Sequence, residues 1–174
     1  MEISGVKLIK KPSKIHNHIY HYIDNYYTDN FGSQWNEFRD TQIDNIKNTH
    51  SYDRFFNETG LKPDDFKNKK VLEVGSGAGR FTNILMKYTH ADVHSVDSSN
   101  SVYANKLNNN NYISDRLNIY KASIYDLPFE ENQFDIVICF GVIQHTPNIK
   151  KTMDSLCNQV KSDGLIIVDF YPYN

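Results

Sequence analysis

A chain of 174 residues with 39% hydrophobic residues is long enough for one domain with a substantial core. Its formal net charge of −2 excludes the basic footprint of a nucleic-acid-binding domain. The longest apolar run, 136–143, is far shorter than the ~18 residues that a membrane span needs, and residues 1–14 lack the apolar stretch of a signal peptide. We therefore expect a cytoplasmic protein without nucleic-acid or membrane partners, whose cysteines, Cys139 and Cys157, are reduced.

The first 60 residues differ in kind from the rest. They contain a dense set of aromatic side chains that must be buried or form a sticky surface: Tyr20, Tyr22, Tyr26, Tyr27, Phe31, Trp35 and Phe38. The stretch from Ser51 to Gly60 has the pattern of a capped helix that ends at a glycine. We predict an aromatic-rich N-terminal helical extension over 1–60, which packs on a second unit, 61–174, and acts as a lid.

From residue 69 onward, strand-like and helix-like segments alternate, which favours a doubly wound parallel sheet with ligands at the carboxyl ends of its strands. The pattern predicts strands over 70–74, 92–96, 117–120, 134–140 and 165–170, and helices over 80–88, 99–109 and 149–161. Gly164 is expected at the entry to the last strand. The run of asparagines at 108–111 is interpreted as compositional bias in a surface connection.

A glycine loop follows the first predicted strand. Gly75, Gly77 and Gly79 are spaced G-x-G-x-G, whereas a dinucleotide fingerprint has its third glycine at position 80, which is Arg80 here. Glu73 precedes the loop, and a carboxylate there suits an ammonium or sulfonium better than a pyrophosphate. The loop therefore indicates a nucleotide-type ligand that carries a positive charge.

Asp97 ends the second predicted strand, 22 residues after the first glycine. A carboxylate at this place is positioned to accept both hydroxyls of a ribose, in NAD sites as in other adenosine sites. The loop from Leu127 to Asp135 contains Pro128 and two phenylalanines, and it would flank an adenine. Asp97 therefore predicts an adenosine-type ligand without identifying it.

Together these residues resemble the class I S-adenosylmethionine-dependent methyltransferases, over about residues 65–170. The resemblance implies a Rossmann-like sheet in the order 3-2-1-4-5, with S-adenosylmethionine as the cofactor. It implies that Asp97 holds the ribose diol, that Ser98 lies beside the adenine, and that Ser123 stands where the family often has an acid. The remaining cofactor residues implied by the family are Glu73, Gly75, Ser76, Gly77 and Gly79 along the methionine and ribose, the backbone of Ile124 at the adenine, and Phe140 and Gly141 beside the methyl group.

A second resemblance lies before the glycine loop. One bacterial subgroup of these methyltransferases has an F-G-x-Q-W-x-x-F-x-x-T-Q-x-D segment there. It is matched by Phe31, Gly32, Gln34, Trp35, Phe38, Thr41, Gln42 and Asp44.

Histidines supply the remaining candidates for chemistry. His145 stands where a general base could act on a hydroxyl acceptor, although Thr146-Pro147 beside it also reads as a helix start, so that bracing the loop is the alternative role. His16, His18 and His21 lack further nearby ligands, and we expect no metal site.

The expected function is methyl transfer from S-adenosylmethionine to a small-molecule acceptor. The alternatives are a cofactor-binding but inactive fragment or regulatory subunit, and an NAD-dependent oxidoreductase. The family usually has two further strands after the fifth, and here the chain ends at Asn174. We therefore expect a shortened domain whose exposed fifth strand promotes self-association.

Overall fold

Parallel strands form the centre of the molecule: β5 (Lys70–Val74), β6 (Asp92–Asp97), β7 (Leu117–Lys121), β8 (Phe134–Cys139) and β9 (Val160–Val168). They lie in the order β7-β6-β5-β8-β9, so the predicted order 3-2-1-4-5 is confirmed. The computed structural model describes residues 1–24, 43–44, 49–113 and 116–169. The residues of the second resemblance, apart from Asp44, lie outside these ranges.

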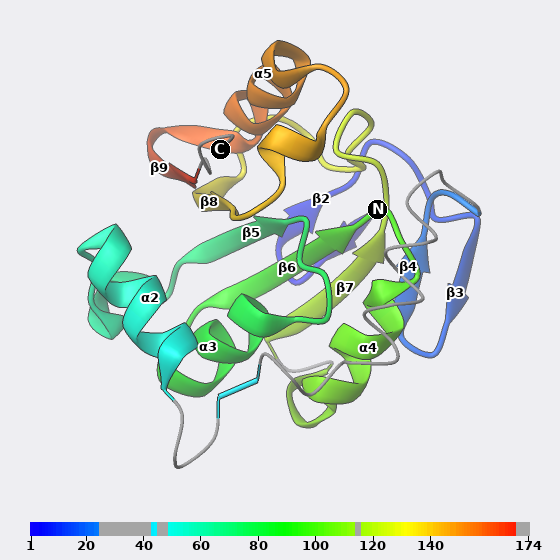
Figure 1. Ribbon diagram of the computed structural model, residues 1–174. Coiled ribbons are helices and arrows are strands. Elements are labelled where there is room, and N and C mark those ends of the chain that lie inside the picture. Colours follow the sequence, from blue (N-terminus) through cyan, green and yellow to red (C-terminus); the bar gives the residue numbers. More distant parts are fainter. Residues whose placement is uncertain (25–42, 45–48, 114–115, 170–174) are drawn as a thin grey trace.

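Helices cover both faces of the sheet (Figure 1). They are α2 (His50–Thr59), α3 (Arg80–Tyr88), α4 (Ser101–Asn108) and α5 (Ile149–Gln159), with short 3-10 turns η1 (Pro63–Phe66), η2 (Asn110–Tyr112) and η3 (Ile143–His145). Phe55, Ile84 and Val102 place α2, α3 and α4 in one apolar cluster. Leu156 places α5 in the other. The architecture is therefore a Rossmann-like α/β sandwich.

The strands supply alternate residues to the two apolar layers. Val71 belongs to the cluster with α3, whereas its neighbour Leu72 belongs to the cluster with α5. This alternation follows from the two-residue period of a strand. It also directs Glu73, two residues after Val71, toward the face that α3 and α4 cover.

The N-terminal region departs from the predicted helical extension, because residues 1–24 contain two β-hairpins. The strands are β1 (Glu2–Ile3), β2 (Val6–Lys7), β3 (Lys14–His16) and β4 (Ile19–His21). Apolar and basic residues alternate here, which is a strand period, and both tight turns have positive φ at their central residues. The hairpin β3–β4 extends the sheet, with β4 parallel to β7.

Helix α2 confirms the helix predicted from the Ser51–Gly60 stretch. It ends at Gly60, which adopts the left-handed conformation with φ of 68°. Its first turn is held by Asp44, whose carboxylate accepts the backbone N–H groups of Ser51 and Tyr52 at 2.9 and 2.8 Å. Burial acts to raise the pKa of Asp44, but these N–H donors outweigh burial and lower it.

The last strand begins earlier than predicted. Helix α5 ends at Gln159 and β9 starts at once, so Gly164 lies inside the strand instead of before it. The register shifts between Phe134 and Ile136 of β8, and a Cβ at position 164 would lie 2.8 Å from the carbonyl oxygen of Asp135. Glycine at position 164 therefore allows the backbones of β8 and β9 to approach closely at this bulge.

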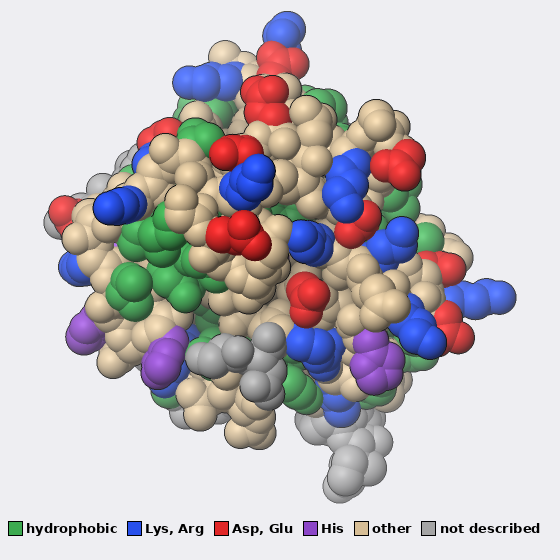
Figure 2. All heavy atoms as spheres, turned by 180° about the vertical axis from the view of Figure 1, so that it is seen from behind, with side chains coloured by type: hydrophobic (Ala, Val, Ile, Leu, Met, Phe, Trp, Pro, Cys, Tyr) green, Lys and Arg blue, Asp and Glu red, His purple; other side chains and the backbone are tan. Residues whose placement is uncertain are grey.

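Charges of both signs are spread over the surface. Figure 2 shows acidic and basic side chains interspersed across the face seen from behind. Within the described part of the chain, no helix is long and apolar enough to cross a membrane.

Candidate functional site

The glycine loop forms the base of the candidate site, at the carboxyl ends of β5 and β6. Gly75, Gly77 and Gly79 all have positive φ, at 81°, 53° and 84°, which explains the need for glycine. The N–H groups of Gly75 and Ser76 donate to the carbonyl of Val96 at 2.7 and 3.1 Å. The loop is thus hydrogen-bonded to the end of β6 before it enters α3.

Asp97 and the glycine loop are in direct contact. The Oδ2 atom of Asp97 accepts the N–H of Gly77 at 2.9 Å, and Oδ1 accepts both the N–H and the hydroxyl of Ser99 at 2.8 Å. A carboxylate oxygen has two acceptor positions, so Oδ2 retains one beside the loop. Asp97 is half-buried, and this remaining position can accept a hydroxyl of a ligand.

Glu73 lies behind the glycine loop, with only 4% of its surface exposed. Its Oε2 accepts a short hydrogen bond from the Thr82 hydroxyl and a second from Ser95 at 3.3 Å. Burial raises the pKa of Glu73 to about 7, against the opposing effect of these hydroxyl donors. The structure therefore places a carboxylate that titrates near neutrality directly under the loop.

Cys139 lies at the end of β8, and the pKa of its thiol is raised. Burial is the main cause that raises the pKa of its thiol. The negative charges of Asp169, Glu73 and Asp97 raise the pKa of Cys139 further. Carboxylates from the ends of β5 and β6 and from the residue after β9 thus act on the same small region.

The residues expected at the adenine lie along the loops after β6 and β7. Ser98 is half-buried, and Ser123 is 6% exposed, with its hydroxyl accepting the N–H of Tyr125 at 3.2 Å. The carbonyl of Ile124 accepts the hydroxyl of Ser155 of α5 at 2.5 Å. These contacts hold the loop after β7 close to α5.

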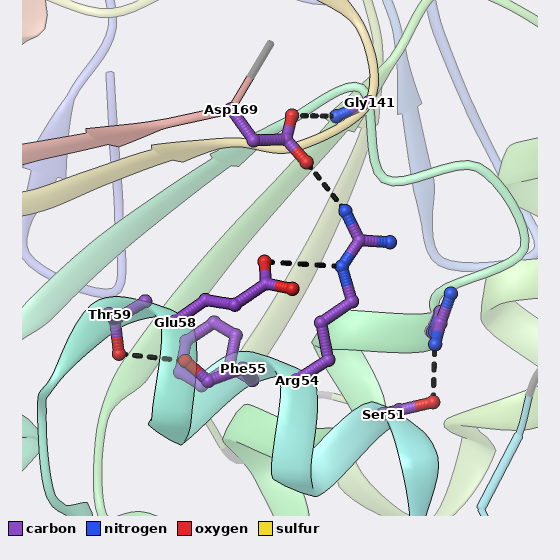
Figure 3. Close-up of polar contacts among 8 residues, drawn as sticks. Ser51, Arg54, Phe55, Glu58, Thr59, Gly141 and Asp169 are labelled. Carbon is purple, nitrogen blue, oxygen red and sulfur yellow. Dashed lines mark hydrogen bonds and ion pairs between the residues drawn. The ribbon is translucent and has the colours of Figure 1, made fainter. Parts of the chain in front are cut away.

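Phe140 and Gly141, expected at the methyl group, follow β8. Phe140 packs edge-on against Phe81 and Phe55, with ring centroids 5.0 and 5.9 Å away. The N–H of Gly141 donates to Oδ1 of Asp169 at 2.5 Å, and Oδ2 of Asp169 binds Arg54 of α2 at 2.7 Å (Figure 3).

Sequence reasoning missed Asp169 and Arg54. Asp169 had a usable signal, because it follows an apolar strand as Asp97 ends another. Arg54 had none, since nothing local in the sequence distinguishes it from the other basic residues near α2.

His145 ends η3, in the loop after β8, and its side chain is exposed. The preceding Val142 covers Gly75, so closely that a Cβ at position 75 would lie 2.2 Å from its Cγ2. Helix α5 begins at Ile149 with Asn148 as its cap, so Thr146-Pro147 precedes the helix start. His145 therefore lies on the loop that covers the glycine loop, open to solvent.

One cavity lies apart from this edge. A cavity of about 310 Å³ lies at the amino end of β7, between Leu117, Tyr20 and the β1–β2 turn. Among the residues that the structure describes, no three His, Cys, Asp or Glu side chains are grouped to hold a metal ion.

Comparisons with known proteins agree on one family. Residues 72–168 match the family described as "Methyltransferase domain". The chain is 30% identical over 105 residues to a ubiquinone biosynthesis O-methyltransferase of Rickettsia bellii, which covers 60% of this chain and 42% of that protein. It is 31% identical over 109 residues to a ubiquinone/menaquinone biosynthesis C-methyltransferase of Bartonella quintana, with the same two coverages.

Among solved structures, a SAM-dependent methyltransferase from Aquifex aeolicus shares the fold. The TM-score is 0.57 at 18% identity, covering 75% of this chain and 67% of that chain. The chain spans less than half the length of the two relatives above.

Proposed function

The chain belongs to the methyltransferase domain family, and we propose that it transfers a methyl group from S-adenosylmethionine to a small-molecule acceptor. The observation that carries the proposal is the arrangement at the carboxyl ends of β5 and β6, where Oδ2 of Asp97 accepts the N–H of Gly77 at 2.9 Å and the Glu73 carboxyl lies buried behind the same loop. A carboxyl group at position 73 suits a cofactor with a sulfonium and an ammonium group better than the pyrophosphate of NAD. This argues against the oxidoreductase alternative.

The residues present fit the cofactor in specific ways. Oδ2 of Asp97, held beside the Gly77 N–H, has an acceptor position for a ribose hydroxyl. The loop turns at Gly75 and Gly79, where positive φ and the close approach of Val142 and Asn105 leave no room for a Cβ. Ser98, Ser123 and the backbone of Ile124 are proposed to contact the adenine.

The bound cofactor supplies an activated methyl group, so the protein's task is alignment and the exclusion of water. Phe140 and Gly141 are proposed to border the methyl group. Phe140 is held by Phe55 of α2 and Phe81 of α3. Gly141 is held by Asp169. Contacts from three separate parts of the chain thus hold the two residues that are proposed to border the methyl group.

The direct test measures the melting temperature with S-adenosylmethionine, its demethylated product and NAD. Binding to the folded state alone adds about 2.7 kcal/mol at 100 times the dissociation constant, so the first two should raise the melting temperature clearly. Asp92→Asn, at the opposite end of β6 from Asp97, serves as the control variant and should respond as the wild type does. A response to NAD alone would contradict the proposal.

The acceptor atom is the next question. The two curated relatives are named for O- and C-methyl transfer, so similarity to them does not choose between oxygen and carbon. We propose a small molecule as the acceptor. The test is incubation of a cell extract with isotopically labelled cofactor, followed by mass spectrometry. Label found mainly in protein or nucleic acid would contradict a small-molecule acceptor.

A second candidate function is cofactor binding without turnover. It is favoured by the position of His145, the one proposed general base, whose side chain is exposed to solvent. Calorimetric binding combined with the labelled-extract assay separates the candidates, because binding with no labelled product supports the second.

We also propose that the protein is cytoplasmic and self-associates through β9. Both cysteines are unpaired, with Cys157 exposed, which suits a reducing compartment. Residues 162–165 of β9 are exposed, including 43% of Leu165. Light scattering should show dimers that Leu165→Lys weakens, and a monomer at all concentrations would overturn the association.

A further inference from the structure

Asparagines at the end of α4 contact the glycine loop. The amide of Asn108 donates to the carbonyl of Ala78 at 2.9 Å, and the amide of Asn109 donates to the carbonyl of Gly79 at 3.2 Å. The amide of Asn105 lies 3.0 Å from the hydroxyl of Ser76. Three residues of the loop, Ser76, Ala78 and Gly79, are therefore held by α4 and its C-cap residue.

Their spacing explains how one helix does this. Asn105, Asn108 and Asn109 stand at positions i, i+3 and i+4, which share one face of a helix. The interpretation of the asparagine run as a surface connection is thus wrong for Asn109, which is fully buried, as is Asn105. The signal available in the sequence was this helical spacing, rather than the run itself.

The asparagines are also joined to one another and to the residues under the loop. The Asn109 amide donates to Oδ1 of Asn105 at 2.9 Å and accepts from Asn83 of α3 at 3.0 Å. The Asn105 amide lies 2.8 Å from the Ser95 hydroxyl and 3.1 Å from the Thr82 hydroxyl. Both hydroxyls donate to Glu73.

Asn105 fits tightly against the loop as well. A Cβ at position 79 would lie 2.2 Å from Oδ1 of Asn105. The third glycine of the loop is therefore required by an asparagine of α4. The amide and the glycine form one packed unit.

We propose that Asn105, Asn108 and Asn109 form an amide clamp on the glycine loop, in which Asn108 and Asn109 fix peptide planes and Asn105 holds the Ser76 side chain, and that the clamp so sets the affinity for S-adenosylmethionine. The peptide unit is planar, so a carbonyl held toward α4 directs the following N–H in the opposite sense. Apolar residues would fill the same space without fixing these planes. This inference rests on the proposed function, because it assigns positioning residues to that site.

The same helix also links the clamp to Asp97. Helix α4 begins at Ser101, whose hydroxyl accepts from the Ser99 hydroxyl, and the Ser99 backbone N–H in turn donates to Asp97. The start of α4 thus positions the proposed ribose acceptor, and its end positions the loop. Displacing α4 would move both parts of the site together.

Asn108 provides the sharpest test, because it is only half-buried and its replacement leaves the buried pair in place. Asn108→Ala removes the donor to Ala78, and Asn108→Asp keeps the shape but places a carboxylate oxygen against that carbonyl. Asn110→Ala is the matched control, since Asn110 is exposed in η2 just beyond the clamp. The measurements are calorimetric affinity for S-adenosylmethionine and its demethylated product, and melting temperature without ligand.

We expect Asn108→Ala to weaken cofactor binding about fivefold, the usual effect of one neutral hydrogen bond, and Asn108→Asp to weaken it more. Where turnover is measurable, KM for the cofactor should rise while kcat at saturation stays unchanged. Unchanged affinity in both variants, with normal wild-type binding, would overturn the clamp even if the melting temperature fell. Failure of the wild type to bind would instead contradict the proposed function, and this inference with it.

Discussion

Asp169 and Arg54 form an ion pair at 2.7 Å between residues 115 positions apart in the chain. The second oxygen of Asp169 holds the N–H of Gly141, so one carboxylate joins α2, the end of β9 and the turn after β8. Arg54 also lies over the ring of Phe81, 5.7 Å from its centroid. This pair fastens the N-terminal part of the chain to the edge where the cofactor is proposed to bind.

Arg54→Ala should destabilise the protein. The side chains of Arg54 and Asp169 are 23% and 16% exposed, between the surface and buried cases, so we expect a loss of about 1–3 kcal/mol in the free energy of unfolding. Urea denaturation measures it. Lys150→Ala is the control, because Lys150 is paired with Asp154 in an exposed position and its loss should not change stability measurably. Equal effects in the two variants would show that the Asp169 pair has no special role.

Glu73→Gln should change how stability depends on pH. The pKa of Glu73 is raised to about 7 in the folded state from 4.5, so the folded state retains a proton that the unfolded state has lost between these values. Stability therefore falls as pH rises through this window, by about 3 kcal/mol from this one group.

The glutamine variant lacks this loss, so its stability relative to the wild type should improve by about that amount between pH 4 and pH 8. Urea denaturation at both pH values measures the difference. If removing the charge at position 73 is also unfavourable for a cationic cofactor, the same variant should bind S-adenosylmethionine more weakly at pH 8. A constant stability difference across the range would contradict the raised pKa.

Asp97→Asn should weaken cofactor binding while leaving the fold intact. The amide keeps the shape of the side chain but loses the charge in its bonds to Gly77 and Ser99 and in the proposed bond to the ribose. Charge-assisted hydrogen bonds contribute about 1.5–3 kcal/mol, which corresponds to an affinity about 10- to 150-fold lower. Calorimetry measures the cofactor affinity of this variant and of the control Asp92→Asn. Equal affinities in the two variants would show that the ribose does not bind at Asp97.

Gly79→Ala should cost more stability than Gly60→Ala. Both glycines have positive φ, and left-handed backbone at a residue with a side chain costs about 1–2 kcal/mol. At position 60 a Cβ meets nothing within 4 Å, whereas at position 79 it meets Asn105 at 2.2 Å and Asn109 at 2.6 Å. Thermal and urea denaturation then compare the cost of backbone strain alone, in Gly60→Ala, with the cost of backbone strain and steric overlap, in Gly79→Ala. Equal losses of stability would show that Asn105 and Asn109 can move away from an added Cβ at little cost.

The parts of the fold that the sequence predicted well have local signals. Strand β5 and helix α3 begin and end where expected, because an apolar run, a glycine loop and an amphipathic helix follow one another without ambiguity. Strand β9 was placed too late, since Val160 and Lys161 continue the helical pattern of α5. The pairing with Phe134 that makes them a strand is a long-range contact.

The candidate site shows the same division. Asp97 and the glycines were predictable because each follows a strand at a fixed distance. Arg54 and Asn105 were not, since their roles depend on α2 and α4 packing against particular carboxyl ends. A single sequence specifies the residues that a strand presents at its own end, but the residues that a neighbouring helix contributes emerge only from packing.

The pairing of β4 with β7 has a consequence for the order of assembly. Ile19 lies opposite Ile119, so the hairpin β3–β4 is synthesised long before β7, the strand against which it docks. Closing a loop of this length costs conformational entropy before any contact offsets it, which makes late docking the favourable route. The hairpin β3–β4 should therefore be the last part of the sheet to join and the first to detach, so its amide hydrogens should exchange ahead of those of β5 and β6.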